Sequence, residues 1–312
     1  MNVQLKLLQF LLIIMLVCLV FGGGNTKPAF AEEKPLLLPA PADCSTCCKK
    51  VNLYPGIDVN NLMQIKYTVK YTKFAKDQES VGSFIMIDRS GLKRSRKWHR
   101  YRVILEKDGI DYKDLIVLTE PQHIKGLAVL TWMYLDPNRE RDNWIWLPSQ
   151  RKIRRASPAE DDDAAFGSDL TTEELTTRSW NNETYAFVKE DATVAGYTSQ
   201  YTGKTYYKNT PGWVVEATPK RKPWYYSKRT LFIPKNIGAQ IHDDVFDPNG
   251  KKFKDLLRVY EIRDNGCIPM TYVECTDHRT NHTTAVEIEW IKFNSGVDEK
   301  LLSPKALMRT KW

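Results

Sequence analysis

Two short apolar runs, each carrying tryptophan, constrain the fold of this chain more than any other feature. The first run, residues 127–135, is apolar on both faces of a strand apart from Thr131. The second, residues 144–147, follows a turn and carries Trp144 and Trp146 on one face, with apolar residues on the other. A strand in a solvent-facing sheet alternates apolar and polar residues. Both faces of this hairpin are therefore expected to be covered, by packed elements or by a ligand.

The residues after the hairpin predict a small lid beside the sheet. Ser157 and Glu160 have the spacing of a capping box, with Pro at the first helical position, and Gly167 is placed to end that helix. The acidic run 160–163 lies near the start of the helix, where the helix dipole favours negative charge. Residues 171–174, Thr-Thr-Glu-Glu, predict a second cap and another short helical turn.

The rest of the chain predicts a meander of strands. Residues 64–71 alternate apolar and polar side chains, which is typical of a strand, after one helical turn at 58–63 that Asp58 caps. Residues 84–88 and 98–105 flank a turn and predict a hairpin. Further strands are predicted at residues 114–118, 151–155, 185–189, 212–217, 225–232, 256–263, 268–275 and 284–293, with a terminal turn through Met308. This pattern favours a mainly β (α+β) fold, a large antiparallel sheet that curls into an open barrel.

The first 31 residues have the pattern of a cleavable signal peptide. Lys6 precedes an apolar stretch at 7–21, and an Ala-Phe-Ala sequence ends at Ala31 before two glutamates. A membrane anchor is one alternative, but the stretch is shorter than the ~20 residues that a spanning helix needs. A lipoprotein signal at Cys18 is another, but the residue before Cys18 is not small. We expect cleavage after Ala31.

Cleavage after Ala31 predicts a periplasmic or secreted protein with two regions. Residues 32–57 contain several prolines and cysteines and predict an extended leader. Residues 58–312 are long enough for one large β domain. Removing Lys6 and Lys27 lowers the formal net charge from +8 to +6, an excess that favours anionic surfaces.

Two basic clusters, residues 93–97 and 151–155, predict contact with an anionic partner. Nucleic acid suits the charge, but an exported protein seldom meets it. Anionic lipid headgroups and transient contact with a membrane surface are therefore expected instead, and no nucleic acid. A solvated strand face is the alternative interpretation of both clusters.

Five cysteines remain after cleavage: Cys44, Cys47, Cys48, Cys267 and Cys275. The last two cannot bridge each other along one extended strand, since eight residues span ~26 Å. We expect a disulfide that fastens the N-terminal cluster. The C-x-x-C spacing also suggests zinc or redox chemistry, but no second C-x-x-C or nearby histidine completes a zinc site.

Residues with catalytic potential are few. The sequence has no G-x-S-x-G, Walker loop, H-E-x-x-H or dinucleotide fingerprint. His242-Asp243-Asp244 is the best candidate for a metal site, although a solvated turn is the favoured interpretation. Neither an enzymatic activity nor a cofactor is expected.

Residues 118–175 resemble the LolA-like family of outer-membrane lipoprotein-sorting proteins. In that family a P-x-x-x-x-G-x-x-x-L-x-W strand is followed by a W-x-x-L-P strand, an Arg-rich strand and a Gly-Ser-Asp segment. The matching residues are Pro121, Gly126, Leu130, Trp132, Trp144, Leu147, Pro148, Arg151, Arg154, Arg155, Phe166, Gly167, Ser168, Asp169 and Leu170. The resemblance extends more loosely over residues 58–308.

The resemblance implies an unclosed barrel whose mouth is plugged by short helices, with an apolar cavity that holds acyl chains in the periplasm. It also implies a lipid or lipidated protein as cargo, carried toward the outer membrane, and an exporter of the resistance-nodulation-division (RND) type as partner. The residues expected to line the cavity are Leu130, Trp132, Trp144, Trp146, Phe166 and Leu170. Arg154 and Arg155 are expected to meet the headgroup or to hold the lid.

Two other functions stay open at this point. One is a non-enzymatic adaptor that docks on an RND-type exporter or another envelope complex, with the tryptophans as plain core. The other is an enzyme built on a metal site at residues 242–244.

Overall fold

The computed structural model describes residues 53–157, 160 and 162–309. The chain divides into two compact units, Met1–Pro39 and Ala40–Trp312, and every described residue belongs to the second. The helices are α2 (Val59–Lys70) and α3 (Pro304–Arg309), with single turns at η1 (Gln122–Ile124), η3 (Ala165–Gly167), η4 (Glu173–Thr177), η5 (Trp180–Asn182) and η6 (Glu299–Leu301). The strands are β1 (Asp77–Ile87), β2 (Lys93–Lys107), β3 (Ile110–Glu120), β4 (Ala128–Tyr134), β5 (Asp142–Leu147), β6 (Lys152–Ala156), β7 (Glu183–Val194), β8 (Tyr197–Thr198), β9 (Thr205–Tyr206), β10 (Thr210–Pro219), β11 (Lys228–Pro234), β12 (His242–Phe246), β13 (Lys252–Tyr260), β14 (Met270–Asp277) and β15 (His282–Phe293).

One antiparallel sheet of 13 strands dominates the described chain, in the order β6-β5-β4-β3-β2-β1-β15-β14-β13-β12-β11-β10-β7. Most strands pair with their neighbours in the sequence, and β7 pairs with β10 across the small β8–β9 hairpin. The exception is the ladder between β1 and β15, which runs from Gln78↔Phe293 to Ile87↔Thr283. This ladder joins the first strand of the sheet to the last. The predicted large antiparallel sheet is confirmed.

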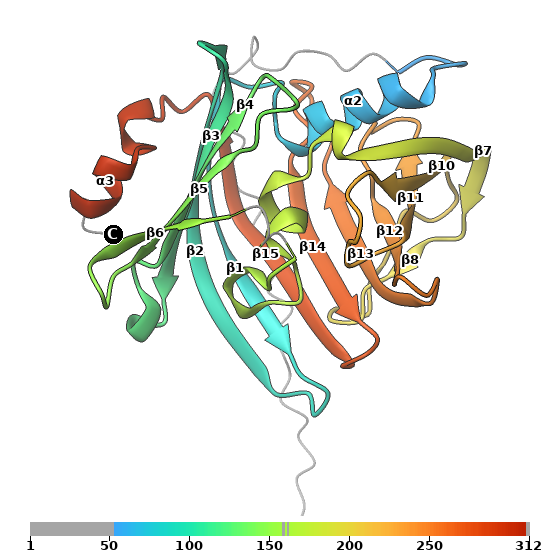
Figure 1. Cartoon of the computed structure of the whole chain (residues 1–312). Helices are drawn as coiled ribbons and strands as arrows, with labels where there is room; N and C mark the ends of the chain where they lie inside the picture. Colours follow the sequence, from blue (N-terminus) through green and yellow to red (C-terminus); the bar gives the residue numbers. More distant parts are fainter. Residues whose placement is uncertain (1–52, 158–159, 161, 310–312) are drawn as a thin grey trace, which may run out of the picture. The chain divides into compact units, whose positions relative to one another are not determined.

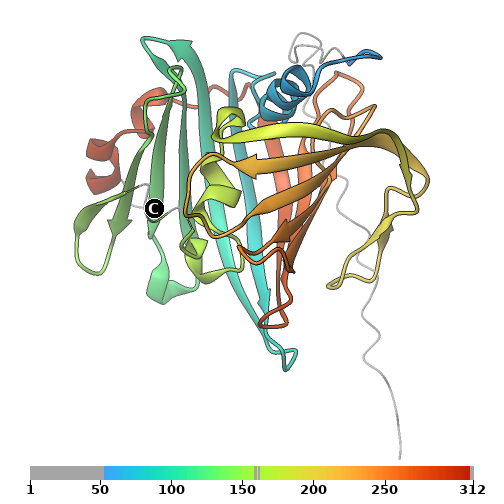
Figure 2. The same ribbon diagram turned by 45° about the vertical axis from the view of Figure 1, so that its right-hand side comes forward.

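The sheet curls but does not close, because β6 and β7 are both edge strands. These two edges follow each other in the sequence, and the connection between them crosses the concave face of the sheet (Figures 1 and 2). We call residues 162–182 of this connection the crossover segment. Together with α2 it lies inside the curve of the sheet. The predicted open barrel with short helices at its mouth is therefore confirmed.

A glycine lets a tryptophan lie against the backbone of β1. At Gly82 the register of β1 against β15 shifts. A Cβ atom on Gly82 would lie 2.2 Å from the carbonyl oxygen of Glu287 and 2.5 Å from the ring of Trp98. Any larger residue would therefore displace Trp98 from the concave side of the sheet.

Helix α2 replaces the strand predicted at residues 64–71, so that prediction is wrong. Asp58 caps the helix as predicted, and its carboxylate accepts from Asn60 N at 2.8 Å. The helix then continues because its inner face is buried against the sheet, including Met63 and Tyr67. Burial of that face outweighs the strand-like alternation, since tertiary packing routinely overrides local propensity.

The other predicted strands are present, and many are longer than predicted. The hairpin at residues 84–88 and 98–105 is β1–β2, whose strands have 11 and 15 residues. The strand predicted at 225–232 begins later, at Lys228 of β11. Strand β12 is missing from the predictions because its sequence, His-Asp-Asp-Val-Phe, has the polar composition of a turn.

Alternation along the strands gives the sheet two apolar faces. In β3, Ile116 and Leu118 belong to a cluster on the concave face, whereas Leu115 and Val117 belong to a cluster on the convex face. The concave cluster consists of Phe84, Trp98, Ile116, Leu118, Leu170, Tyr226, Val245, Phe253, Leu256, Val273, Cys275 and Val286. The convex cluster consists of Val103, Leu115, Val117, Ala128, Leu130, Leu302 and Leu307.

The C-terminal residues cover the convex cluster. Leu302 and Leu307 are fully buried in it, and the indole N–H of Trp132 donates to Leu302 O at 3.0 Å. The terminal turn predicted through Met308 is α3, on the outside of the curved sheet (Figure 1). In the part of the chain that the structure describes, every helix is too short or too polar to cross a membrane.

Candidate functional site: the concave interior

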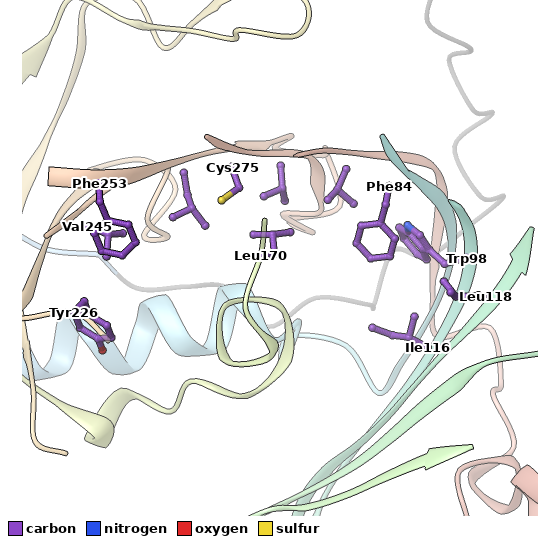
Figure 3. Close-up of a cluster of buried hydrophobic side chains, with 12 residues drawn as sticks. Phe84, Trp98, Ile116, Leu118, Leu170, Tyr226, Val245, Phe253 and Cys275 are labelled. Carbon is purple, nitrogen blue, oxygen red and sulfur yellow. The ribbon is translucent and has the colours of Figure 1, made fainter. Parts of the chain in front are cut away.

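Leu170 of the crossover segment lies at the centre of the concave cluster. Figure 3 shows it at the tip of a loop, with Phe84 and Trp98 on one side and Val245 and Phe253 on the other. The side chain is buried. The middle of the concave core is therefore filled by a covering segment and not by the sheet itself.

A cavity of about 50 Å³ lies beside Leu170. Its wall is apolar on one side and charged on the other. The lining residues are Lys70, Tyr71, Phe84, Trp98, Arg100, Arg102, Ile116, Leu170, Glu174, Leu175, Arg258, Met270, Val273, Val286 and Ile288. A water molecule takes up about 30 Å³ of the liquid, so this closed arrangement has room for only a few atoms. A longer apolar chain would have to displace Leu170 and Leu175.

Buried ion pairs form the charged side of the interior. Arg229 donates to both carboxylate oxygens of Glu183, at 2.9 and 2.6 Å, and to Asp243 at 2.8 Å. Arg258 donates to the second oxygen of Asp243 at 3.1 Å. Burial raises the pKa of Glu183, but Arg229 and Arg178 outweigh burial and lower that pKa to about 2. Carboxylates and guanidinium groups in this network are therefore charged, and they fix four strands to one another.

Two lysines of α2 lie in the same interior. Lys66 is buried, and no described residue forms a hydrogen bond or ion pair with it. Burial and repulsion by Arg229 lower the pKa of Lys66 to about 7. Lys70 donates to the backbone carbonyl of Glu174 at 3.2 Å. Burial, then repulsion by Lys66, lowers the pKa of Lys70 well below its ordinary value.

A capping box anchors the crossover segment at η4. Thr171 N donates to Glu174 Oε2 at 2.9 Å, and Glu174 N donates to Thr171 Oγ1 at 3.1 Å. Arg178 Nε donates to Glu173 Oε1 at 2.6 Å. The cap predicted at 171–174 is confirmed. The turn that follows is of the π type, because Arg178 N bonds to Glu173 O at 3.2 Å, and π turns are frequent at functional sites.

The first helix predicted in this segment begins on residues that lie partly outside the described part of the chain, and its predicted end at Gly167 is a bend. Ser157 N donates to Glu160 Oε1 at 3.2 Å, which is one half of the predicted capping box. Phe166 and Gly167, however, have φ of 53° and 68°, so the backbone reverses there. Such a φ costs about 1–3 kcal/mol at a residue other than glycine. The guanidinium of Arg96 stabilises the bend by donating to Phe166 O.

The structure divides the predicted lining residues between the two faces of the sheet. Phe166 packs against the concave cluster and Leu170 belongs to it. Leu130, Trp132, Trp144 and Trp146 belong to the convex cluster or pack against it. These four share one face because the register pairs Leu130 with Trp144 across β4 and β5. The six residues are thus not brought together, and a role in ligand binding stays a prediction for each.

The two predicted arginines lie on edge strand β6. Arg154 pairs with Glu160 at 2.6 Å, just before the crossover segment. Arg155 pairs with Asp142 of β5. A headgroup role stays a prediction for both.

His242-Asp243-Asp244 belongs to β12, so the prediction of a solvated turn is wrong. Asp243 is fully buried, and Arg229 and Arg258 compensate its charge. The ring of His242 stacks on Tyr197 at a centroid distance of 4.0 Å. Among the residues with a described position, no group of His, Cys, Asp and Glu has the arrangement of a metal site.

The two C-terminal cysteines differ in state. Cys267 is disulfide-bonded, whereas Cys275 is a buried free thiol. They do not bridge each other, which agrees with the prediction. Cys44, Cys47 and Cys48 lie outside the described residues, as do the predicted signal peptide and most of the leader, so the partner of Cys267 stays a prediction.

A larger cleft of about 300 Å³ lies outside the apolar interior. It separates the β4–β5 turn from the β10–β11 connection, and its walls combine charged residues with aromatic and other apolar ones. Arg139 lies over the Tyr134 ring at 3.5 Å, and Arg221 lies over the Trp224 ring at 4.3 Å. Turn η4 stands between the two spaces, since Glu173 lines the cleft and Glu174 lines the inner cavity.

Sequence reasoning missed the charged residues of the interior. They are Lys66, Lys70, Glu183, Arg229 and Arg258. A helical interpretation of residues 59–70 would have given one signal, because Lys66 and Lys70 stand one turn apart beside buried Met63 and Tyr67. The three residues on strands gave no such signal, since charged residues alternating along strands predict a solvated face.

Solved structures share this architecture. The chain is similar to a DUF1329 family protein from Desulfovibrio piger, with a TM-score of 0.68 and 21% identity over 80% of this chain and 98% of that one. It is similar to an outer membrane lipoprotein-sorting protein domain from Vibrio parahaemolyticus, with a TM-score of 0.64 and 19% identity over 75% and 92% of the two chains. A LolA superfamily protein from Nitrosomonas europaea gives a TM-score of 0.58 and 11% identity over 80% and 99%. The fold is therefore LolA-like, as the resemblance predicted.

A comparison with curated proteins finds no match. A family model described as "Uncharacterized protein" matches residues 111–309, from β3 to the end of α3. The chain belongs to that family.

Proposed function

We propose that the protein is a periplasmic carrier or chaperone that binds the apolar chain of a lipid or of a lipidated protein. The chain would lie between the concave face of the sheet and the crossover segment. One observation carries the proposal: Leu170, at the centre of the concave core, belongs to a segment that connects the two open edges of the sheet. Location in the periplasm rests on the signal-peptide pattern of residues 1–31.

The energetics support exchange of the crossover segment for a ligand. Burying an acyl chain gains about 0.8 kcal/mol per methylene. A chain of moderate length therefore compensates the loss of the contacts made by Leu170 and Leu175. The LolA-like fold, shared with a domain named for outer membrane lipoprotein sorting, supports the same function. No covalent step is part of this proposal.

Two measurements test it. Lipid extraction and mass spectrometry of protein purified from its native periplasm should yield a bound lipid. A fluorescent acyl probe should bind the purified protein, and Ile288→Trp, which fills the cavity, should weaken that binding about tenfold or more. Ile153→Trp is the matched control, because Ile153 is also partly buried but packs on the convex cluster.

Each outcome has a clear meaning. Absence of lipid in the extract together with absence of probe binding would refute the proposal. Equal effects of the two Trp substitutions would place the probe outside the concave interior and would also refute it. Thermal unfolding of both variants checks that added bulk has not unfolded the protein.

A second candidate function is an adaptor that docks on an RND-type exporter or another envelope complex. The observation that favours it is the partial exposure of Trp144 and Trp146 on the convex face beside α3. Partly exposed aromatic residues are frequent at interfaces. If the adaptor function is correct, Trp146→Ala abolishes co-purification with an envelope transporter and leaves acyl-probe binding unchanged.

A further inference from the structure

Two arginines at the charged end of the inner cavity share a single carboxylate. Arg100 and Arg102 both line the cavity. Arg100 Nη2 donates to Asp114 Oδ2 at 2.9 Å, and Arg102 Nε donates to the same oxygen at 2.5 Å. One carboxylate therefore compensates two guanidinium charges on this wall.

The opposite wall is also charged, but there Glu183 and Asp243 balance Arg229 and Arg258. Arg258 lines the cavity, and its counterion Asp243 is shared with Arg229. Glu174 is the carboxylate among the lining residues, and Lys254 binds it at 3.1 Å. The cavity wall thus carries four cations, counting Lys70, against one carboxylate that is already paired.

Lys70 is the cation of this group that lacks a carboxylate. Its hydrogen bond goes to the backbone carbonyl of Glu174 at 3.2 Å, and no carboxylate in the described chain reaches it. Glu174 belongs to the crossover segment, which an entering chain displaces. Displacement would leave the ammonium buried without a partner, which is strongly unfavourable.

A second donor in the same wall has no acceptor. Trp98 Nε1 is buried and forms no hydrogen bond within the described residues, and Trp98 lines the cavity beside its apolar wall. Buried indole N–H groups usually have a partner. An unused donor and a lysine amine without a carboxylate partner therefore line one small space together with apolar side chains.

We infer that the site binds a free single-chain amphiphile with a compact anionic head, a carboxylate or a phosphate, and that Lys70 binds this head while the chain lies along the apolar wall. The inference rests on the proposed function and narrows its ligand. An acyl chain attached to a protein ends in an amide or ester, which offers acceptor oxygens but no charge. A free acid or phosphate supplies the missing anion, and charge-assisted hydrogen bonds of this kind are about twice as strong as neutral ones.

The test compares ligands that differ in the head alone. Oleic acid, oleyl phosphate and oleyl alcohol are titrated against the full chain by displacement of the acyl probe, with inorganic phosphate as a headgroup without a chain. We expect the acid and the phosphate ester to bind at least tenfold more tightly than the alcohol. Inorganic phosphate alone should displace nothing.

Substitutions at Lys70 and Trp98 then show where the anionic headgroup binds. Lys70→Met should reduce the preference for acid over alcohol by about 10- to 100-fold and leave affinity for the alcohol nearly unchanged. Lys70→Arg should retain the preference. Lys113→Met is the control, because Lys113 is a buried lysine that pairs with Glu299 on the convex side. Trp98→Phe removes the unused indole donor and should reduce the preference for acid over alcohol several-fold. This variant provides a second test if Lys70→Met does not fold.

Failure of this inference differs from failure of the proposed function. If none of the three amphiphiles binds, the carrier function itself is refuted. If the alcohol binds as tightly as the acid, or if Lys70→Met keeps the preference, the carrier function stands and the anionic head is refuted. Displacement by inorganic phosphate alone would indicate a site for free anions and would also overturn the inference.

Discussion

The concave and convex faces of the sheet are covered in different ways. Each is an apolar surface that a piece of the chain outside the sheet must cover. On the convex face the cover is the C-terminal residues, and the buried charge beside the apolar cluster is Lys113, which pairs with Glu299. On the concave face the cover is the crossover segment with α2, and charged residues such as Arg229 and Glu183 are buried beside the apolar cluster.

The difference supports the proposal that the concave face binds a ligand and that the convex face is purely structural. Burying ions requires a large desolvation energy, and apolar residues of similar volume would often stabilise a fold as well or better. A face that only had to be closed would resemble the convex one. The concave face instead combines buried charge, an incompletely filled cavity and a cover held by a capping box, which are features of a binding site.

The largest expected effect comes from breaking the concave ion network. Arg229→Met should lower the free energy of unfolding by about 3–5 kcal/mol, because it leaves Glu183 and Asp243 buried without their shared partner. Urea denaturation measures the loss. The neighbouring exposed pair Lys228–Glu216 provides the control, since Lys228→Met should cost at most about 1 kcal/mol.

Equal costs for Arg229→Met and Lys228→Met would show that water reaches the concave network. The distinction between the two faces would then lose its energetic basis.

A smaller effect distinguishes the two covers. Leu307→Ala on the convex face should cost about 2–5 kcal/mol, the usual range for a fully buried leucine. Leu170→Ala on the concave face should cost less than half as much. The reason is that the crossover segment can open locally while the rest of the protein stays folded. A substitution in such a segment lowers the free energy of global unfolding by no more than the free energy needed to open the segment. Urea denaturation of both variants gives the comparison.

Amide hydrogen exchange provides an independent check. Residues 162–182 should exchange faster than the C-terminal residues 299–309, and Leu170→Ala should accelerate exchange in the crossover segment alone. A loss of stability in Leu170→Ala as large as that in Leu307→Ala would identify the crossover segment as permanent core and would remove the route by which a ligand enters.

The sequence predicted the sheet well because its strands are joined mostly by short turns. Alternation and turn residues identify a hairpin such as β1–β2 within about 30 residues of sequence. The ladder between β1 and β15 joins residues that are about 200 positions apart, so no local pattern could reveal it. The strand pattern also favoured an open barrel, and the likeness of residues 118–175 to a known family added the short helices at its mouth.

The candidate site was harder to predict than the fold. Two-sided apolarity at residues 144–147 predicted a cover on both faces of the hairpin, and the structure shows one on the face of Trp144 and Trp146. The C-terminal residues pack against these tryptophans, and the proposed ligand space lies on the opposite side around Leu170. Buried charges are invisible to pattern analysis as well, since Arg229 and Asp243 become interior residues only after β11 and β12 pair.

The smallest expected effect on the free energy of unfolding comes from Lys66, a lysine that is buried on the concave side without a partner among the described residues. The pKa of Lys66 is lowered from 10.5 to about 7 by burial, then by Arg229. Below pH 7 the lysine is charged in both the folded and the unfolded chain, and burial of the charge destabilises the fold fully. Above pH 10.5 it is neutral in both states, and this destabilisation is absent. The contribution of Lys66 to stability therefore rises with pH between these limits.

Lys66→Met should accordingly stabilise the protein at and below neutral pH, by about 1–3 kcal/mol, since an apolar side chain of similar length replaces a buried cation. The gain should shrink as the pH rises from about 7 toward 10.5. Urea denaturation at pH 6.5, 8 and 9.5 measures the difference between variant and wild type, and Lys113→Met on the convex face serves as control because Glu299 compensates that charge. A gain that is independent of pH would mean that Lys66 keeps an ordinary pKa in the fold, and the charged interior would then be more hydrated than its burial indicates.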